Sequence, residues 1–177
     1  MLTTDRLLLR RFATADAAAF AAVLADPETM APWGGPYDVD RAQRELVHYL
    51  DHQLRHGFAP FAVVRDGRLI GDMGCQYLED GTDVELLYRL FRDAWGIGLA
   101  TEAGDAALAH AFSALGCVEV VAVIAEDNQP SRCLAQRLGF TPGNVGTYYG
   151  QRLQRHIVTP EQHAHAPPAP ASVALGK

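Results

Sequence analysis

The sequence lacks several features that would mark particular classes of protein. Its 177 residues carry a net charge of −6, whereas a nucleic-acid-binding surface usually shows a basic stripe. No apolar run approaches the roughly 20 residues needed to span a bilayer. The first residues, MLTTDRLLLRRF, lack the apolar core and the cleavage site of a signal peptide. We therefore expect a cytoplasmic protein that binds neither nucleic acid nor a membrane.

Cysteine is also scarce. The three cysteines, Cys75, Cys117 and Cys133, are widely spaced and odd in number. No CxxC motif or Cys/His pair has the spacing of metal ligands, which argues against a disulfide framework and against a zinc site. His163 and His165 stand close together near the end of the chain, in a segment with almost nothing to bury. We expect reduced, buried thiols and no bound metal.

The end of the chain offers little to bury. Residues 162–177 are rich in alanine and proline, and this composition predicts a disordered tail. The preceding residues, 1–161, suffice for one domain with a substantial core. The oligomeric state stays open between a monomer and a homodimer.

Hydrophobic periodicity predicts a mixture of strands and helices. Asp66-Gly67 separates two β-rich runs and indicates a hairpin. The segment 29–38 is rich in proline and glycine and is expected to be a loop. Strands are expected over 6–12, 58–65, 69–77, 84–91, 118–124, 147–149 and 153–159, and helices after Thr14 and over about 42–54, 98–115 and 127–138. Hairpins followed by a βαβ crossover predict an α+β fold, with a mixed, mostly antiparallel sheet and helices on both faces.

Two glycines stand where the strand 84–91 leads into the next helix. Gly96 and Gly98 leave the backbone without side chains at a helix N-terminus, where unpaired N–H groups favour an anion such as phosphate. No GKS or GKT follows Gly98, which excludes a Walker A loop. The third glycine of a dinucleotide-binding GxGxxG motif is also absent.

Two segments in register carry a resemblance to a known family. WGIGLATEA at 95–103 resembles the acetyl-CoA pyrophosphate loop of the GNAT N-acetyltransferase superfamily, and DNQPSRCLAQRLGF at 127–140 resembles its second cofactor motif. The opening TDRLLLRRF is similar to the branch that contains the ribosomal-protein alanine N-acetyltransferases. The resemblance runs from about residue 2 to residue 161. It implies a GNAT domain over 1–161, acetyl-CoA as co-substrate, and strands that splay apart at the acyl-CoA site.

The resemblance also implies how coenzyme A is held. The amides of 96–101 would receive the pyrophosphate, and the pantetheine arm would pair with the exposed end of a splayed strand. The residues implied in cofactor binding are Tyr88, Arg89, Leu90, Trp95, Gly96, Ile97, Gly98, Leu99, Ala100, Thr101, Asn128 and Ser131.

Acetyl transfer to an amine needs a base and a proton for the leaving thiolate. Glu85 matches a glutamate common at this place in the family and is the candidate base; the alternative is a solvated or ion-paired carboxylate. Many members have a tyrosine where this chain has Ala135. The ribosomal-protein branch resembles this chain in having a serine at the position of Ser131, near the thiol, and this resemblance implies Ser131 as the acid. The alternative is a helix-start serine that satisfies backbone groups.

Trp33, Tyr148 and Glu85 are the candidates for contact with the acceptor. Tyr149, the next strand aromatic, is considered with Tyr148 for the lining of the acceptor site, and core packing is the alternative for both tyrosines. The main interpretation is an N-acetyltransferase that moves the acetyl group of acetyl-CoA directly to a primary amine within a ternary complex. The amine can be a protein or peptide N-terminus, an amino acid, a polyamine or an aminoglycoside. The alternative is a non-catalytic module that binds or senses acyl-CoA.

Overall fold

One mixed sheet organises the molecule. The structure is a computed structural model that describes residues 1–79 and 81–166. Within these residues eight strands form a sheet in the order β1-β2-β3-β4-β5-β6-β8-β7. Their bounds are β1 Leu2–Thr3, β2 Leu8–Arg10, β3 Phe61–Arg65, β4 Arg68–Tyr77, β5 Val84–Leu90, β6 Val120–Ile124, β7 Thr141–Tyr148 and β8 Gln151–Val158. The predicted mixed, mostly antiparallel sheet is thereby confirmed.

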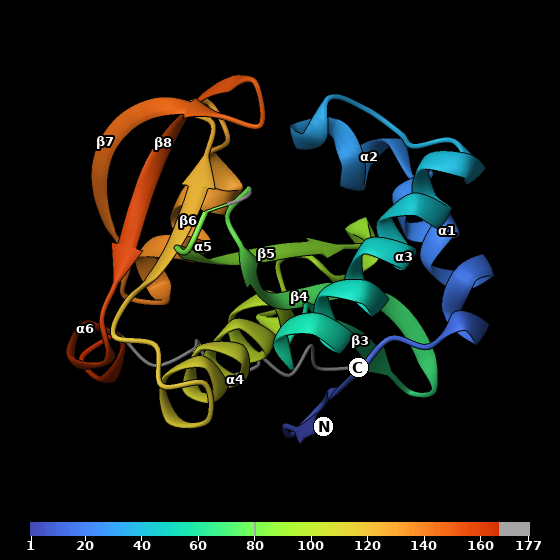
Figure 1. Ribbon diagram of the computed structural model, residues 1–177, viewed down its shortest axis with the longest axis horizontal. Coiled ribbons are helices and arrows are strands. Elements are labelled where there is room, and N and C mark those ends of the chain that lie inside the picture. Colours follow the sequence, from blue (N-terminus) through green and yellow to red (C-terminus); the bar gives the residue numbers. More distant parts are fainter. Residues whose placement is uncertain (80, 167–177) are drawn as a thin grey trace, which may run out of the picture.

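The sheet opens between β5 and β6. All other neighbouring strands pair antiparallel, whereas β5 and β6 are parallel and share a single register pair, Glu85 with Val121. Beyond that pair the two strands separate toward their C-terminal ends (Figure 1). The expected splay is present, and it leaves backbone groups of both strands available to a ligand.

Helices cover both faces of the sheet. Helices α1 (Ala17–Leu24), α2 (Pro27–Met30) and α3 (Val39–His56) gather on one side, and α4 (Leu99–Ser113) lies against the other (Figure 1). Consecutive strand residues show why: Leu86 packs in the core cluster with α4, and Leu87 packs in the cluster with α1 and α3. Neighbouring side chains of a strand point to opposite faces. The sheet is therefore buried on both sides at β5.

The boundaries of α3 and α4 follow from their caps. The Asp38 side chain accepts the N–H of Arg41 and starts α3, and Gly57 ends it in the left-handed conformation. Helix α4 begins after Gly98. Its buried face is made mainly of small alanines, which let the helix lie close to the sheet: Ala103, Ala107 and Ala111.

The C-terminal part differs from the prediction. Residues 160–164 form helix α6, and Thr159 and Gln162 form a capping box at its start. His163 Nδ1 lies 3.1 Å from the carbonyl oxygen of Leu138. Residues 162–166, expected to be disordered, are therefore ordered, because proline at the first helical turn and a capping box favour a helix. The rest of the predicted tail, 167–177, lies outside the described residues.

One further detail departs from the prediction. The segment 29–38, expected to be a loop, contains the end of α2 and a 3₁₀ turn at Ala31–Trp33. Helix α5 runs over Gln129–Arg137, close to the expected bounds. Within the described residues, no helix combines the length and the apolarity that crossing a membrane requires.

Candidate active site

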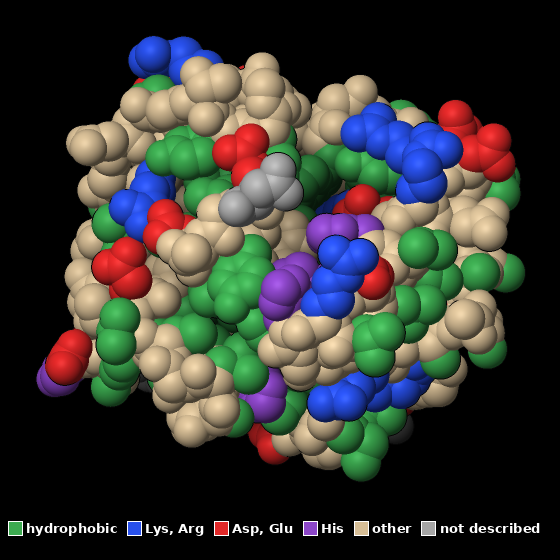
Figure 2. Space-filling view, in the orientation of Figure 1, with side chains coloured by type: hydrophobic (Ala, Val, Ile, Leu, Met, Phe, Trp, Pro, Cys, Tyr) green, Lys and Arg blue, Asp and Glu red, His purple; other side chains and the backbone are tan. Residues whose placement is uncertain are grey.

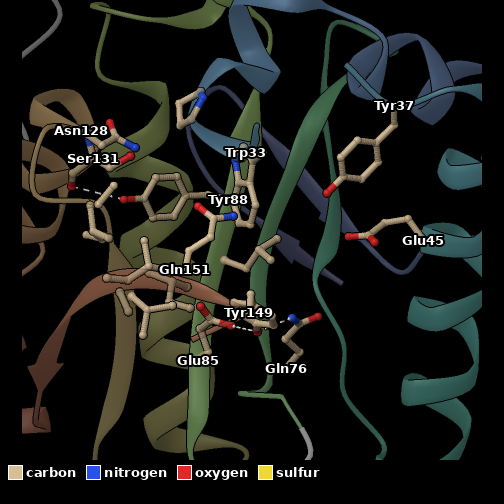
Figure 3. A pocket seen from close by; sticks show the side chains of 18 of the residues that line it. Trp33, Tyr37, Glu45, Gln76, Glu85, Tyr88, Asn128, Ser131, Tyr149 and Gln151 are labelled. Carbon is tan, nitrogen blue, oxygen red and sulfur yellow. Dashed lines mark hydrogen bonds between the residues drawn. The ribbon is translucent and has the colours of Figure 1, made fainter. Parts of the chain in front are cut away.

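A cavity of about 410 Å³ lies where β5 and β6 separate. Its walls come from β4, β5 and β6, from α3 and α5, and from the turn between β7 and β8. In the space-filling view the surface is hollowed between the part formed by β7 and β8 and the part formed by α2 and α3 (Figure 2). Figure 3 shows Asn128 and Ser131 on one side of the cavity and Tyr37 and Glu45 on the other. One chamber thus joins the start of α5 to the helices on the far side.

The α5 side of the cavity brings three predicted residues together. The Tyr88 hydroxyl donates to the carbonyl oxygen of Ser131 over 3.2 Å, and Asn128 accepts the Ser131 N–H over 3.2 Å. Asn128 is therefore the N-cap of α5. All three residues line the cavity, as expected for groups that would face a pantetheine arm and its sulfur.

The glycine loop before α4 has the conformation of an anion cradle. Gly96 and Gly98 have φ of 73° and 84°, and no side chain caps the N-terminus of α4. A Cβ placed on Gly96 would meet nothing within 4 Å, so the loop is open on that side. Leu99 and Thr101 are buried and can contribute only backbone N–H groups.

A set of hydrogen bonds around Arg6, here called the brace, holds this loop in place. The sequence did not predict these contacts. Arg6 Nη1 donates to the carbonyl oxygen of Ile97 over 2.9 Å. Glu102 accepts from the Arg6 Nε and backbone N–H, and also from the Thr4 hydroxyl. These residues are about 96 positions apart in the chain, and no local pattern reveals such a contact.

Glu85 is buried at the floor of the cavity. Only 2% of the residue is exposed, and β4 places Gln76 directly opposite it. The Tyr149 hydroxyl donates to Glu85 Oε2 over 2.5 Å (Figure 3). Burial raises the pKa of Glu85 to about 7, against a smaller lowering by its hydrogen bonds. The alternative of a solvated or ion-paired carboxylate is excluded, because the group is buried and no ion pair to it is present among the described residues.

Of the two adjacent tyrosines considered for the acceptor site, Tyr149 is the one at the cavity. Tyr149 lines the cavity and Tyr148 does not. The difference arises because β7 ends at Tyr148, and Tyr149-Gly150 form the turn to β8, both with positive φ. Strand alternation does not apply inside a turn.

The Arg89 side chain points away from the cofactor site. It is fully buried and contacts Asp72, Glu45 and the Tyr49 hydroxyl, at 2.8 Å, 2.9 Å and 2.5 Å. This network links β4 and β5 to α3. The prediction that Arg89 binds the cofactor can therefore concern only its backbone.

The two tryptophans differ in role. Trp33 lines the cavity from the turn after α2, as predicted for an acceptor-facing residue. Trp95 donates its indole N–H to the carbonyl oxygen of Leu90 over 2.7 Å and packs on the core. It thus fixes the end of β5 relative to the glycine loop, and its side chain is not on the cavity wall.

Comparison with known proteins identifies the family. The acetyltransferase (GNAT) domain family matches residues 6–141. The uncharacterized N-acetyltransferase YoaA of Bacillus subtilis is 29% identical over 154 residues, which cover 84% of this chain and 87% of YoaA. YkkB, an uncharacterized protein of the same organism, is 30% identical over 145 residues, or 78% of this chain and 84% of YkkB.

Solved structures share the fold. An acetyltransferase from Agrobacterium tumefaciens superposes with a TM-score of 0.78 at 28% identity, over 89% of this chain and 92% of that chain. RimJ of Mycobacterium smegmatis, solved in complex with CoA-disulfide, superposes with a TM-score of 0.73 at 23% identity, over 94% and 85% of the two chains. The matches span most of the domain that holds the cavity and the glycine loop. The protein belongs to the GNAT acetyltransferase family, and it is an acyltransferase that uses acetyl-CoA.

Proposed function

We propose that this protein transfers the acetyl group of acetyl-CoA directly to a primary amine within a ternary complex, with Glu85 as the general base. The observation that carries the proposal is the buried Glu85 carboxyl, with its pKa of about 7, in the cavity that the splayed strands open. A base with a pKa near the working pH is largely ionised and still has a high affinity for a proton.

The base is needed because a free alkyl amine is mostly protonated. Its pKa of about 10 leaves roughly one molecule in a thousand neutral at pH 7. Glu85 removes one proton from the ammonium group, and the neutral amine nitrogen then forms its bond to the thioester carbonyl carbon. The oxyanion of the tetrahedral intermediate is stabilised by a backbone N–H near Tyr88, where β5 has left its partner strand. An amide is produced when the carbon–sulfur bond breaks.

The leaving sulfur requires a proton of its own. Ser131 lines the cavity beside Tyr88, whose hydroxyl already donates a hydrogen bond to the Ser131 carbonyl oxygen. The Ser131 hydroxyl is therefore the group we assign to the thiolate: it donates its proton to the leaving sulfur and takes up the second proton that the nitrogen loses as the intermediate collapses, so that coenzyme A leaves as the free thiol. Asn128 caps α5 and fixes the orientation of Ser131.

The glycine loop supports the binding half of the proposal. Gly96 and Gly98 hold the start of α4 open, and the first-turn N–H groups of this helix have no intrahelical acceptor. The pyrophosphate of coenzyme A is the anion that this N-terminus would receive. The brace from Arg6 keeps the loop in place before the cofactor arrives.

Thiol release from acetyl-CoA tests the proposal. The purified protein is incubated with acetyl-CoA and one amine at a time, drawn from amino acids, peptides, diamines and aminoglycosides, and the amide is identified by mass spectrometry. We expect release that depends on an amine and a product heavier by one acetyl group. Tight binding of acetyl-CoA without turnover on any amine would instead support a non-catalytic module.

One observation favours that second candidate. The position that carries a tyrosine acid in many family members is Ala135, which is 1% exposed and lies in the core. No proton donor reaches the cavity from this position. A Ser131→Ala variant that binds acetyl-CoA and keeps full turnover would remove Ser131 from the mechanism, whereas only a parent protein without turnover on any amine would support this second candidate.

A further inference from the structure

Gln76 has a buried oxygen without a partner at the cavity wall. The residue is 6% exposed, and its Nε2 faces the Tyr149 hydroxyl at 3.5 Å. Its Oε1 has no hydrogen-bond partner among the described residues. Figure 3 shows this oxygen turned away from Tyr149, toward the side of the cavity where Glu45 lies. A buried acceptor without a donor is costly, so a donor on a bound molecule would stabilise this arrangement.

Glu45 brings negative charge to the same end of the cavity. It reaches the wall from α3, and one of its oxygens, Oε1, accepts from Arg89 over 2.9 Å. Arg89 also forms an ion pair with the buried Asp72. Two carboxylates thus share one guanidinium, and the cluster keeps a net charge of −1. About 25% of the Glu45 side chain is exposed, which leaves it accessible from the cavity.

Aromatic rings and one cation complete this end of the cavity. Trp33 and Tyr37 line it, and aromatic faces attract cations. Arg41 also lines it, and its guanidinium stacks 3.6 Å from the Tyr37 ring centroid. Arg41 precedes Glu45 by about one helical turn on α3, yet Arg89 is the cation paired with Glu45 in the described ion pairs.

We propose that Gln76 Oε1 and Glu45 form a subsite for a second cationic nitrogen of the acceptor, separate from the amine that reacts at Glu85. The acceptor is then a diamine, or a peptide whose second residue is basic. This inference rests on the proposed function, since it places the reacting amine at Glu85. Gln76 Oε1 and the Glu45 carboxylate both accept hydrogen bonds, so together they select a nitrogen that donates several of them.

Direct binding tests the subsite without any turnover. Calorimetry in saturating coenzyme A compares 1,4-diaminobutane with butylamine, which has the same carbon chain and one nitrogen fewer. We expect the diamine to bind at least tenfold more tightly. Glu45→Gln and Gln76→Leu should each reduce the ratio to less than about threefold, because hydrogen bonds to charged groups are worth tenfold or more. Gln at 45 can still accept from Arg89, which preserves the buried network.

Asp40→Asn is the matched control. Asp40 is exposed on the same helix, away from the cavity, so this variant removes the same charge without touching the subsite. A parallel arm compares the dipeptide amides Ala-Lys and Ala-norleucine. The proposal is supported if the ligand with the second nitrogen binds more tightly in either arm and both subsite variants abolish that difference. The arm in which this happens tells whether the acceptor is a diamine or a peptide. Equal binding in both arms, or a preference that both variants retain, overturns it. Absence of acetyl transfer, with the binding preference intact, would instead refute the proposed function alone.

Discussion

The hydroxyl of Tyr149 lies 2.5 Å from Glu85 Oε2 and donates to it. The two residues are 64 positions apart, and the contact joins the β7–β8 turn to the strand that forms the cavity floor. The backbone N–H of Tyr149 also donates to Glu79 over 2.8 Å. The turn is thus held at two points over the cavity, and its hydroxyl stabilises the ionised form of the base.

Tyr149→Phe should move the pH dependence of catalysis. The hydroxyl favours ionised Glu85, so its loss raises the pKa of the carboxyl and shifts the acidic limb of the kcat/KM profile upward, by about 0.5–1 pH unit. Other groups that face Glu85 stay in place: Glu79, Gln76, Cys75, Tyr88 and the Val123 backbone. The measurement is a kcat/KM profile between pH 5.5 and 9.

Tyr148→Phe provides the control for this experiment. Tyr148 precedes Tyr149 in the chain but does not line the cavity, so the same loss of a hydroxyl there should leave the profile unchanged. Identical profiles for Tyr149→Phe and the parent protein would show that the hydrogen bond does not act on the base.

Glu85→Gln should lower kcat/KM by about 10²–10⁴-fold at pH 8. The loss should shrink at low pH, because Glu85 in the parent protein is protonated below its pKa of about 7 and is then inactive as well. Affinity for acetyl-CoA should remain, since the glycine loop is untouched. A variant with parental activity at pH 8 would eliminate Glu85 as the base.

Glu85→Gln should also change the free energy of unfolding, by an amount that depends on pH. Burial raises the folded-state pKa of Glu85 from 4.5 to about 7. Below pH 4.5 the carboxyl is neutral in both states, and the folded state buries no charge there. Between pH 4.5 and 7 the folded state keeps a proton that the unfolded state has lost. The advantage of a neutral buried carboxyl disappears as pH rises through 7, where a buried charge must form. Glu85→Gln should therefore gain stability relative to the parent between pH 5 and pH 8, by up to about 3 kcal/mol.

Urea unfolding at the two pH values measures this difference. Glu28→Gln, which changes an exposed carboxylate, should show no comparable change. A Glu85→Gln variant with the same pH dependence as the parent would mean that the carboxyl is not buried in solution.

The fold and the glycine loop before α4 could be predicted because their signals are local. Asp66-Gly67 marks the β3–β4 hairpin, and the two glycines mark the start of α4. The acceptor half could not be predicted in this way. Gln76 meets Tyr149 only after β4 and the β7–β8 turn come together, and Arg89 is buried because Asp72 and Glu45 neutralise it. Contacts between distant segments leave no periodic trace in the sequence.

Gly96→Ala should weaken coenzyme A binding about tenfold, which corresponds to about 1.4 kcal/mol. The added methyl projects into open space beside the loop, where the pyrophosphate would approach the amides.

Gly116→Ala is the matched control: it also has a positive φ, 70°, with nothing within 4 Å of its Cβ, but it follows the opposite end of α4. Both variants should lose a similar free energy of unfolding, about 1 kcal/mol, through backbone strain. Calorimetry with coenzyme A separates them, because only a phosphate-binding loop makes the Gly96 variant weaker than the Gly116 variant. Equal affinities would place the pyrophosphate elsewhere.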